Sequence, residues 1–262
     1  MSAKIKSYFE THSHNYLKSP ELYFSIVTHL KNIITMNPHA RFLDVGCGDG
    51  SFVKTLIREG IKMHFFATDI SLSMIRTAKQ NLANHNVQLF AADGFNIPLK
   101  SDIKFDIIHI DSVLHHLIGK TRSKSMRLIE QMIELLVARL SPNGILIVEE
   151  WYYISYIYPT LTSFVVFYGL KLLNFLKLDL SKFTKEIRLD LEVNILHPDQ
   201  ISDLLSTYGS VHLLEKRSGY HGMHNIPGGV PASYRLFLLK DSGHITYILK
   251  NGERKRSYQR KY

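Results

Sequence analysis

Cysteine is nearly absent from this sequence: Cys47 is the only one in 262 residues. A single cysteine excludes an internal disulfide framework, and no cysteines and histidines show the spacing of a structural zinc site. Residues 1–20 also lack the unbroken apolar stretch that a secretory signal needs after its basic start. We therefore expect a protein of the reducing, cytoplasmic compartment, and we predict no metal ligands.

Acidic residues are scarce at the C-terminal end of the chain. Residues 250–262 contain six lysines and arginines and one glutamate, while the whole chain has a net charge of +9. We assign residues 241–262 as a basic C-terminal tail. Clustered Lys and Arg attract nucleic acid and anionic lipid headgroups. The simpler interpretation is a solvated chain end without ordering contacts.

Short apolar runs alternate with amphipathic stretches of helical length from residue 41 onward. This alternation predicts βαβ units and a mostly parallel sheet. The expected strands are 41–45, 63–68, 87–91, 105–110 and 145–148, with later ones at 211–216 and 234–240. We expect one domain over residues 41–240, preceded by a helical cap, residues 1–40, that covers a ligand cleft. Residues 141–144, Ser-Pro-Asn-Gly, are predicted to form a turn.

A glycine-rich loop, residues 46–50, joins the first expected strand to a helix. Glycine lets the backbone turn sharply and approach a ligand where a Cβ atom would fill the space. The spacing is Gly-x-Gly-x-Gly, whereas the dinucleotide fingerprint of a nicotinamide-dependent oxidoreductase is Gly-x-Gly-x-x-Gly. Asp49, inside the loop, would repel a pyrophosphate. The loop therefore favours a ligand with a cationic end.

Two further acids follow the next two expected strands. Asp69 closes the second strand, where a carboxylate can accept hydrogen bonds from both hydroxyls of a ribose. Asp93 follows the third strand, where a carboxylate can accept from an adenine amine. Each acid alone is an ordinary turn or cap residue, but the ends of successive parallel strands face one crevice. S-adenosylmethionine, with its ammonium, sulfonium, ribose and adenine, matches this order of acids.

These motifs resemble the class I methyltransferase family, in particular its small-molecule, type 11/25-like branch. Asp44 to Gly50 is similar to the family's first motif, and residues 105–117 and 140–150 are similar to its fourth and fifth strands with their neighbouring loops. The resemblance implies an α/β, Rossmann-like fold with a seven-stranded, mostly parallel sheet, one antiparallel strand and helices on both faces. It also implies methyl transfer from S-adenosylmethionine.

The resemblance assigns the cofactor-binding residues as well. They are Asp44, Gly46, Cys47, Gly48, Gly50, Asp69, Ile70, Asp93, Gly94 and Asp111, together with Tyr16, which would close over the cofactor from the N-terminal region. Asp111 would lie near the methionine end. Cys47 is interpreted as filling the loop rather than as a nucleophile, because it lies beneath the cofactor.

Two adjacent histidines, His115 and His116, are the candidate catalytic residues. They follow the fourth strand, where an acceptor should meet the cofactor, and histidine titrates near neutrality, as a general base must. Glu149 and Glu150 end the fifth strand nearby. The alternative is that the histidine pair is structural.

An uncharged stretch of twenty residues, 151–170, begins a predicted apolar helical insertion that reaches to about residue 190. It can be a lid over the substrate pocket, an interfacial helix or a membrane span, although a proline, a glycine and five tyrosines disfavour the span. We expect a hydrophobic small-molecule acceptor, with peripheral contact at the inner membrane face through residues 151–177 and the basic tail.

Other functions remain open from the sequence. RNA or protein methylation would use the basic tail, but the Asn/Asp-Pro-Pro-aromatic run of nucleic-acid amino-methylating relatives is absent after the fourth strand, so nucleic acid is not the expected partner. A non-catalytic, membrane-associated protein that binds the cofactor is the alternative from a different class.

Overall fold

The computed structural model describes residues 3–12, 23–33, 39–176, 192–218, 220–221, 226–227 and 238–251. Tyr16, the end of the predicted insertion and half of the predicted tail, residues 252–262, lie outside these residues.

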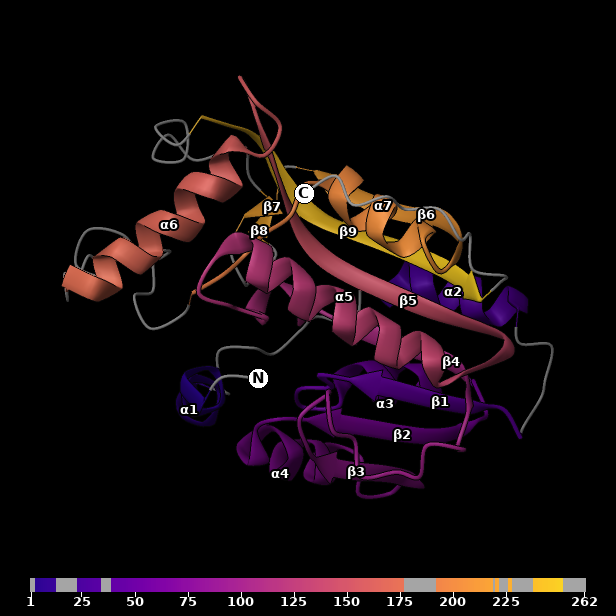
Figure 1. Ribbon diagram of the computed structural model, residues 1–262. Helices are drawn as coiled ribbons and strands as arrows, with labels where there is room; N and C mark the ends of the chain where they lie inside the picture. Colours follow the sequence, from indigo (N-terminus) through magenta and orange to yellow (C-terminus); the bar gives the residue numbers. More distant parts are fainter. Residues whose placement is uncertain are drawn as a thin grey trace.

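A seven-stranded sheet forms the centre of the molecule (Figure 1). Its strands are β1 (Arg41–Val45), β2 (His64–Asp69), β3 (Val87–Ala91), β4 (Phe105–Asp111), β5 (Leu140–Ser155), β6 (Gly209–Ser218) and β9 (Leu239–Asn251). The order is β3-β2-β1-β4-β5-β9-β6, and β9 alone runs antiparallel to its neighbours. This arrangement confirms the predicted Rossmann-like sheet. A separate two-stranded ribbon pairs β7 (Tyr220–His221) with β8 (Ile226–Pro227).

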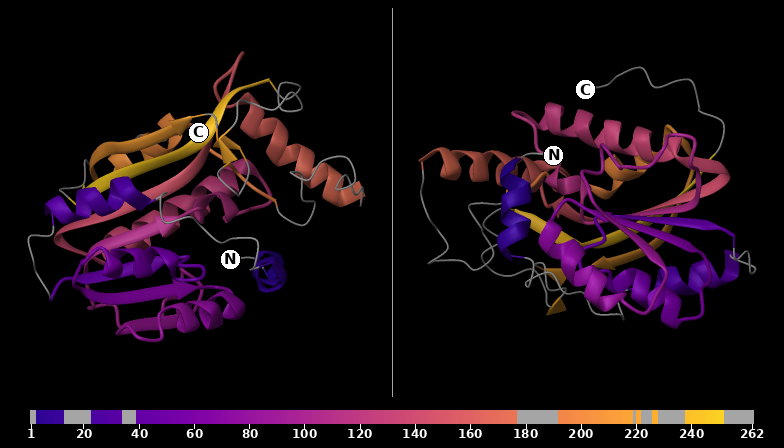
Figure 2. Two further views of the ribbon diagram at one scale, coloured as in Figure 1. Left: turned by 180° about the vertical axis from the view of Figure 1, so that it is seen from behind. Right: turned by 90° about the horizontal axis from the view of Figure 1, so that it is seen from below.

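Helices cover both faces of the sheet (Figures 1 and 2). The helices are α1 (Ala3–His12), α2 (Phe24–Ile33), α3 (Ser51–Arg58), α4 (Leu72–Asn81), α5 (Arg122–Ala138), α6 (Leu161–Leu176) and α7 (Pro198–Ser206), with a short 3-10 helix η3 (Leu114–His116). One core lies beneath α5 and α7, and the other lies beneath α2 and α3. The central strands β1 and β4 are buried on both faces, which is why they read as continuous apolar runs in the sequence.

Helix α1 lies beside the carboxyl end of the sheet, where one acid links it to α4. The Glu10 carboxylate accepts hydrogen bonds from the backbone N–H groups of Leu72 (2.6 Å) and Ser73 (3.1 Å), at the start of α4. These donors have no partner inside their own helix, so a carboxylate there stabilises α4 and holds α1 in place. Phe9, the preceding residue, is thereby positioned at the site.

The structure corrects three predicted boundaries. Residues 141–144 form part of β5 rather than a separate turn, with a register shift against β4 at that point. Strand β5 continues to Ser155, so the helical insertion begins at α6 rather than at residue 151. The tail does not begin at residue 241, because residues 241–250 pair with β5 and residues 243–251 pair with β6. Burial of β9 between two strands satisfies its backbone hydrogen bonds, which the sequence pattern did not reveal.

Helix α6 projects from the sheet at the end where β5 finishes (Figures 1 and 2). Phe167 and Leu170 are buried, but Phe164, Leu172 and Phe175 are exposed, Phe175 by 82%. No helix in the described part of the chain is both long and apolar enough to cross a membrane.

Candidate active site

A pocket opens at the carboxyl ends of β1, β2, β4 and β5. The residues that line it are Phe9, Tyr23, Asp44, Val45, Gly46, Cys47, Gly48, Asp49, Phe52, Thr68, Asp69, Ile70, Met74, Ala92, Gly94, His109, Asp111, Ser112, Val113, His115, His116, Trp151 and His244. Parallel α/β sheets bind ligands at the carboxyl ends of their strands, at the point where the strand order reverses. In this sheet that point lies between β1 and β4.

The glycine-rich loop forms the floor of the pocket. The backbone N–H groups of Gly46 and Cys47 donate to the Thr68 carbonyl at 2.8 and 3.0 Å, which ties the loop to β2. Gly46 has a φ of +77°, and a Cβ atom there would overlap the Val113 side chain. Glycine is therefore required both for the backbone conformation and for the close approach of the loop after β4.

Asp69 lies at the tip of β2 with its carboxylate against this loop. Its Oδ2 accepts from the Gly48 N–H at 3.0 Å, and its Oδ1 accepts from the Ser71 N–H at 2.8 Å. Burial raises the pKa of Asp69 to about 6, although these two N–H groups act in the opposite direction. Each oxygen keeps a further lone pair, so the carboxylate can still accept hydrogen bonds from a ligand.

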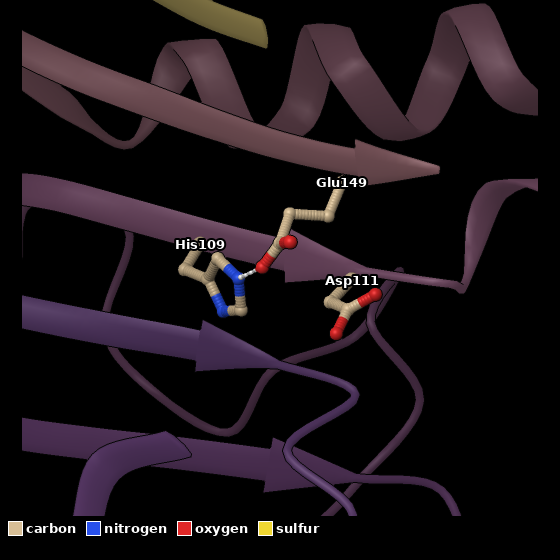
Figure 3. Close-up of side chains that lie close together, drawn as sticks. All are labelled: His109, Asp111 and Glu149. Carbon is tan, nitrogen blue, oxygen red and sulfur yellow. Dashed lines mark hydrogen bonds and ion pairs between the residues drawn. The ribbon is translucent and has the colours of Figure 1, made fainter. Parts of the chain in front are cut away.

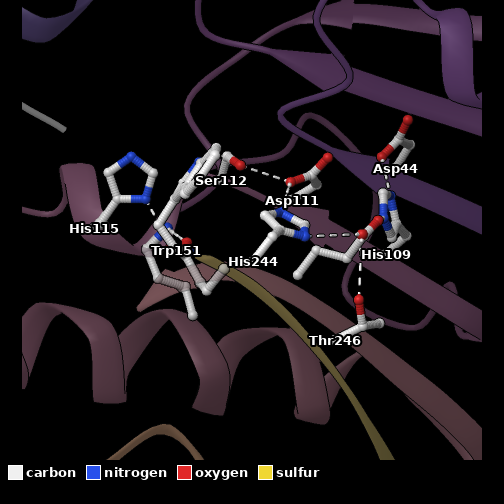
Figure 4. Close-up of polar contacts among 11 residues, drawn as sticks. Asp44, His109, Asp111, Ser112, His115, Trp151, His244 and Thr246 are labelled. Carbon is white, nitrogen blue, oxygen red and sulfur yellow. Dashed lines mark hydrogen bonds and ion pairs between the residues drawn. The ribbon is translucent and has the colours of Figure 1, made fainter. Parts of the chain in front are cut away.

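Asp44, His109 and Glu149 form a buried ion-pair network across β1, β4 and β5 (Figure 4). His109 Nδ1 lies 2.7 Å from Asp44 Oδ1, and His109 Nε2 lies 2.8 Å from Glu149 Oε1. Burial alone would lower the pKa of His109, but the two carboxylates outweigh it and raise the pKa to about 10. His109 is therefore an imidazolium that compensates two buried acids.

Asp111 and His244 extend this network toward the pocket. Asp111 Oδ1 accepts from the Ser112 hydroxyl at 2.7 Å and lies 3.4 Å from His244 Nε2. The ligand atoms of His109, Asp111 and Glu149 lie within 4.8 Å of one another, as a metal site requires (Figure 3). Both nitrogens of His109 already contact carboxylates, so a metal ion would have to displace a proton. We interpret the cluster as an ion-pair network.

The two predicted catalytic histidines differ in their surroundings, although both line the pocket. His115 Nδ1 lies 2.6 Å from Glu150 Oε2, whereas His116 Nδ1 is buried with no hydrogen-bond partner among the described residues. Burial, followed by the neighbouring His115, lowers the pKa of His116 well below its usual value. Its ring packs edge-on against Phe9 at 5.2 Å. His116 is therefore a neutral, poorly basic wall of the pocket.

Most of the predicted cofactor-binding residues meet at this pocket. Asp44, Gly46, Cys47, Gly48, Asp69, Ile70, Gly94 and Asp111 all line it. Burial, with Asp44 and Asp69 nearby, raises the pKa of the Cys47 thiol well above its usual value, so Cys47 stays a neutral thiol.

Gly50 and Asp93 are not among the lining residues. Gly50 caps α3 and faces Leu82, and Asp93 accepts from the Phe95 N–H at 3.0 Å. Their contacts with the cofactor stay predictions, as does that of Tyr16, which lies outside the described residues.

The sequence did not single out His109, His244, Phe9 or Tyr23 as residues of the site. His109 could have been found, because it lies two residues before Asp111 on one strand and so on the same face. His244 could not, because the last strand was expected to end at residue 240. Phe9 and Tyr23 reach the pocket through tertiary packing of the N-terminal helices.

Residues 42–138 match the family model of a methyltransferase domain. No curated protein sequence matches the chain. YcgJ of Bacillus subtilis has a similar structure, with a TM-score of 0.55, 15% identity, and coverage of 88% of this chain and 100% of that one. The magnesium protoporphyrin IX methyltransferase of Synechocystis PCC 6803, solved with bound S-adenosylmethionine, has a TM-score of 0.53, 14% identity, and coverage of 95% and 98%.

The N-methyltransferase NodS of Bradyrhizobium japonicum WM9 is also similar, with a TM-score of 0.50, 14% identity, and coverage of 87% of this chain and 86% of that one. At such low identities these likenesses show the fold alone, and the methyltransferase-domain match concerns residues 42–138, less than half of the chain. Residues 42–138 therefore form a methyltransferase domain, and the chain as a whole has a fold similar to that of methyltransferases solved with S-adenosylmethionine or S-adenosylhomocysteine.

Proposed function

We propose that this protein transfers a methyl group from S-adenosylmethionine to a small, largely apolar acceptor. The observation that carries the cofactor assignment is Asp69, a buried carboxylate at the tip of β2 whose oxygens are oriented by the N–H groups of Gly48 and Ser71. S-adenosylmethionine supplies an electrophilic sulfonium methyl group, so the protein mainly has to position the acceptor and exclude water.

The residues of the pocket fit this cofactor. Asp69 would accept hydrogen bonds from the ribose hydroxyls, and Ile70 and Met74 would provide apolar contacts for the adenine. Asp44 Oδ2 is buried and, within the described residues, has no hydrogen-bond partner, and Asp111 lines the pocket as well. These two acids suit the cationic methionine end.

Two features support an apolar acceptor. The lining of the pocket includes Phe9, Tyr23, Val113 and Trp151. Helix α6 and the loop before it expose apolar side chains at the same edge of the sheet; these are Tyr156, Ile157, Tyr158, Phe164, Val165, Tyr168, Leu172, Phe175 and Leu176, which we call the α6 apolar surface. Exposed apolar surfaces of this kind mark interaction sites, and tyrosines favour the membrane interface.

The α6 apolar surface supports peripheral contact of a cytoplasmic protein with the inner membrane face. The basic tail is predicted to take part in this contact, and its residues 252–262 lie outside the described part of the chain. Flotation with phosphatidylcholine–phosphatidylglycerol vesicles tests this contact. The double change Leu172→Ser and Phe175→Ser should abolish binding, whereas Leu213→Ser, an exposed leucine on β6, should not. Equal flotation of both variants would contradict it.

Incubation with methyl-labelled S-adenosylmethionine and separate lipid, small-molecule, RNA and protein extracts tests the proposed function. We expect label in the lipid or small-molecule fraction and none with Asp69→Asn. Label in RNA or protein would instead support macromolecular methylation. Calorimetric binding of the cofactor with no labelled fraction at all would support a non-catalytic role.

A further inference from the structure

His115 and Glu150 form a buried pair beside the pocket. Glu150 Oε2 lies 2.6 Å from His115 Nδ1 and also accepts from the Trp151 N–H at 3.1 Å, while its Oε1 accepts from the Leu114 N–H at 2.7 Å. Both side chains are less than a tenth exposed. Two backbone donors thus hold the carboxylate in the orientation that faces the imidazole.

A carboxylate at Nδ1 decides which nitrogen of the ring carries the proton. Glu150 accepts from Nδ1–H, which leaves Nε2 as the unprotonated nitrogen of the neutral ring. Nothing in the described ranges forms a hydrogen bond to Nε2. His115 lines the pocket together with Gly46, Asp111 and Trp151, and Figure 4 shows His115 near Trp151. The main chain of His115 is also held, because its carbonyl accepts from the Asn194 N–H at 2.8 Å.

The other three histidines of the pocket are not equivalent to His115. His109 contacts carboxylates with both nitrogens, and His244 lies 3.4 Å from Asp111 and 3.7 Å from Glu149 through its two nitrogens. His116 has no carboxylate partner among the described residues to orient it, and burial weakens it as a base. His115 alone combines an oriented Nδ1 with an Nε2 left for a substrate.

We propose that His115 is the general base of methyl transfer, that Glu150 is its positioning residue, and that the acceptor is a protic group, a hydroxyl or an amine. This inference rests on the proposed function. The acceptor O–H or N–H donates its proton to His115 Nε2, and its lone pair forms the bond to the methyl carbon. The carbon–sulfur bond breaks, its electron pair stays on sulfur, and the proton leaves His115 to solvent.

A carboxylate acceptor would not need this pair, because it is already ionised at neutral pH. The pair therefore distinguishes classes of acceptor. Hydroxyls and protonated amines gain most from a base within hydrogen-bond reach, which typically contributes about 10²- to 10⁴-fold to the rate.

The first test reads the proton on the ring without any acceptor. Long-range ¹H–¹⁵N spectra of the histidine-labelled protein with S-adenosylhomocysteine, at pH 8, should show His115 protonated at Nδ1 and unprotonated at Nε2, assigned by loss of the signals in His115→Gln. Glu150→Gln should shift the proton toward Nε2. A proton on Nε2 in the wild-type protein, or a spectrum of His115 that Glu150→Gln leaves unchanged, would overturn the proposal.

The second test uses the methyl-labelled product formed from the organic-solvent extract. His115→Gln should lower the rate of labelling at saturating cofactor by about 10²- to 10⁴-fold and leave calorimetric binding of S-adenosylmethionine within twofold. His212→Gln, an exposed histidine on β6, is the matched control. The label should resist mild alkali, as a methyl ether or methylamine does. Release of labelled methanol, the mark of a methyl ester, would overturn the proposed acceptor class.

The two proposals fail in different ways. A wild-type protein that does not bind S-adenosylmethionine contradicts the proposed function, whatever the spectra of His115 show. A protein that binds the cofactor and labels the extract equally well with and without His115 contradicts only the assignment of the base.

Discussion

Asp69 is a buried carboxylate whose charge changes near pH 6, within the range in which binding can be measured. Its pKa is raised to about 6 because burial disfavours the charged form more than the N–H groups of Gly48 and Ser71 favour it. Below this pH the carboxyl group is protonated and one of its oxygens becomes a donor. The same shift stabilises the folded protein below pH 4, and this contribution is lost as the pH rises through about 6.

We predict that binding of S-adenosylmethionine weakens as the pH falls below about 6, by up to roughly tenfold per pH unit, because only the ionised Asp69 accepts from both ribose hydroxyls. The Asp69→Asn variant should lose about 1.5 to 3 kcal/mol of the free energy of cofactor binding. Its affinity should not depend on pH in this range. Calorimetry between pH 5 and 8 measures both, with the exposed Asp102→Asn as control. An affinity of the wild-type protein that stays constant over this range would contradict the assignment.

The loop between β1 and α3 packs closely against the loop after β4, and this contact restricts which residues it can contain. Gly46 and Gly60 both have φ values near +80°, a conformation that costs any other residue energy. A Cβ atom at Gly46 would overlap Val113, whereas a Cβ atom at Gly60 would meet nothing within 4 Å. An alanine at Gly60 therefore measures the energetic cost of the backbone conformation alone, and an alanine at Gly46 measures that cost together with the cost of the overlap with Val113.

We predict that Gly46→Ala lowers the free energy of unfolding more than Gly60→Ala does, by about 1 to 3 kcal/mol, because the added methyl group must push away the loop after β4. It should also weaken cofactor binding, whereas Gly60→Ala should leave the affinity unchanged. Urea unfolding and calorimetry on both variants provide the comparison. Equal losses of stability would mean that the backbone conformation, and not Val113, sets the requirement for glycine.

The network of Asp44, His109 and Glu149 concerns the whole molecule, because it joins β1, β4 and β5 inside the sheet, and Thr246 on β9 lies 3.4 Å from Glu149. A charged group buried in this way is tolerated only when it is compensated. Removal of the imidazolium would leave two carboxylates close together in the interior. The stability of the fold should therefore depend on the protonation of one histidine.

We predict that His109→Gln lowers the free energy of unfolding at pH 7 by about 3 to 5 kcal/mol. In the wild-type protein, the contribution of His109 is present in full below pH 6.5 and is lost as the pH rises through about 10, by at most roughly 1.4 kcal/mol per pH unit. Urea unfolding from pH 6 to 10 measures the difference between the two proteins. A constant difference over this range would show that His109 is neutral in the folded state.

Local sequence patterns were sufficient for the first half of the fold and the floor of the site. Strands β1, β2 and β4 are buried between helices and so appear as apolar runs. The glycine loop and Asp69 follow β1 and β2 at positions set by chain direction alone. The ends of β5 and β9 could not be predicted in this way. These two strands pair antiparallel with each other, and β9 also pairs with β6, so their lengths depend on partners that are distant in the sequence.

The Rossmann-like architecture, the glycine loop and the acids at the strand ends could all be predicted from the amino-acid sequence, because each depends on residues that are neighbours in the chain. The partners of the four histidines in the pocket, in contrast, depend on how the chain folds. His115 and Glu150 are 35 residues apart, and His109 meets Asp44 and Glu149 from distances of 65 and 40 residues. Ionisation depends on burial and on charges within a few ångströms, and only the folded chain brings those together.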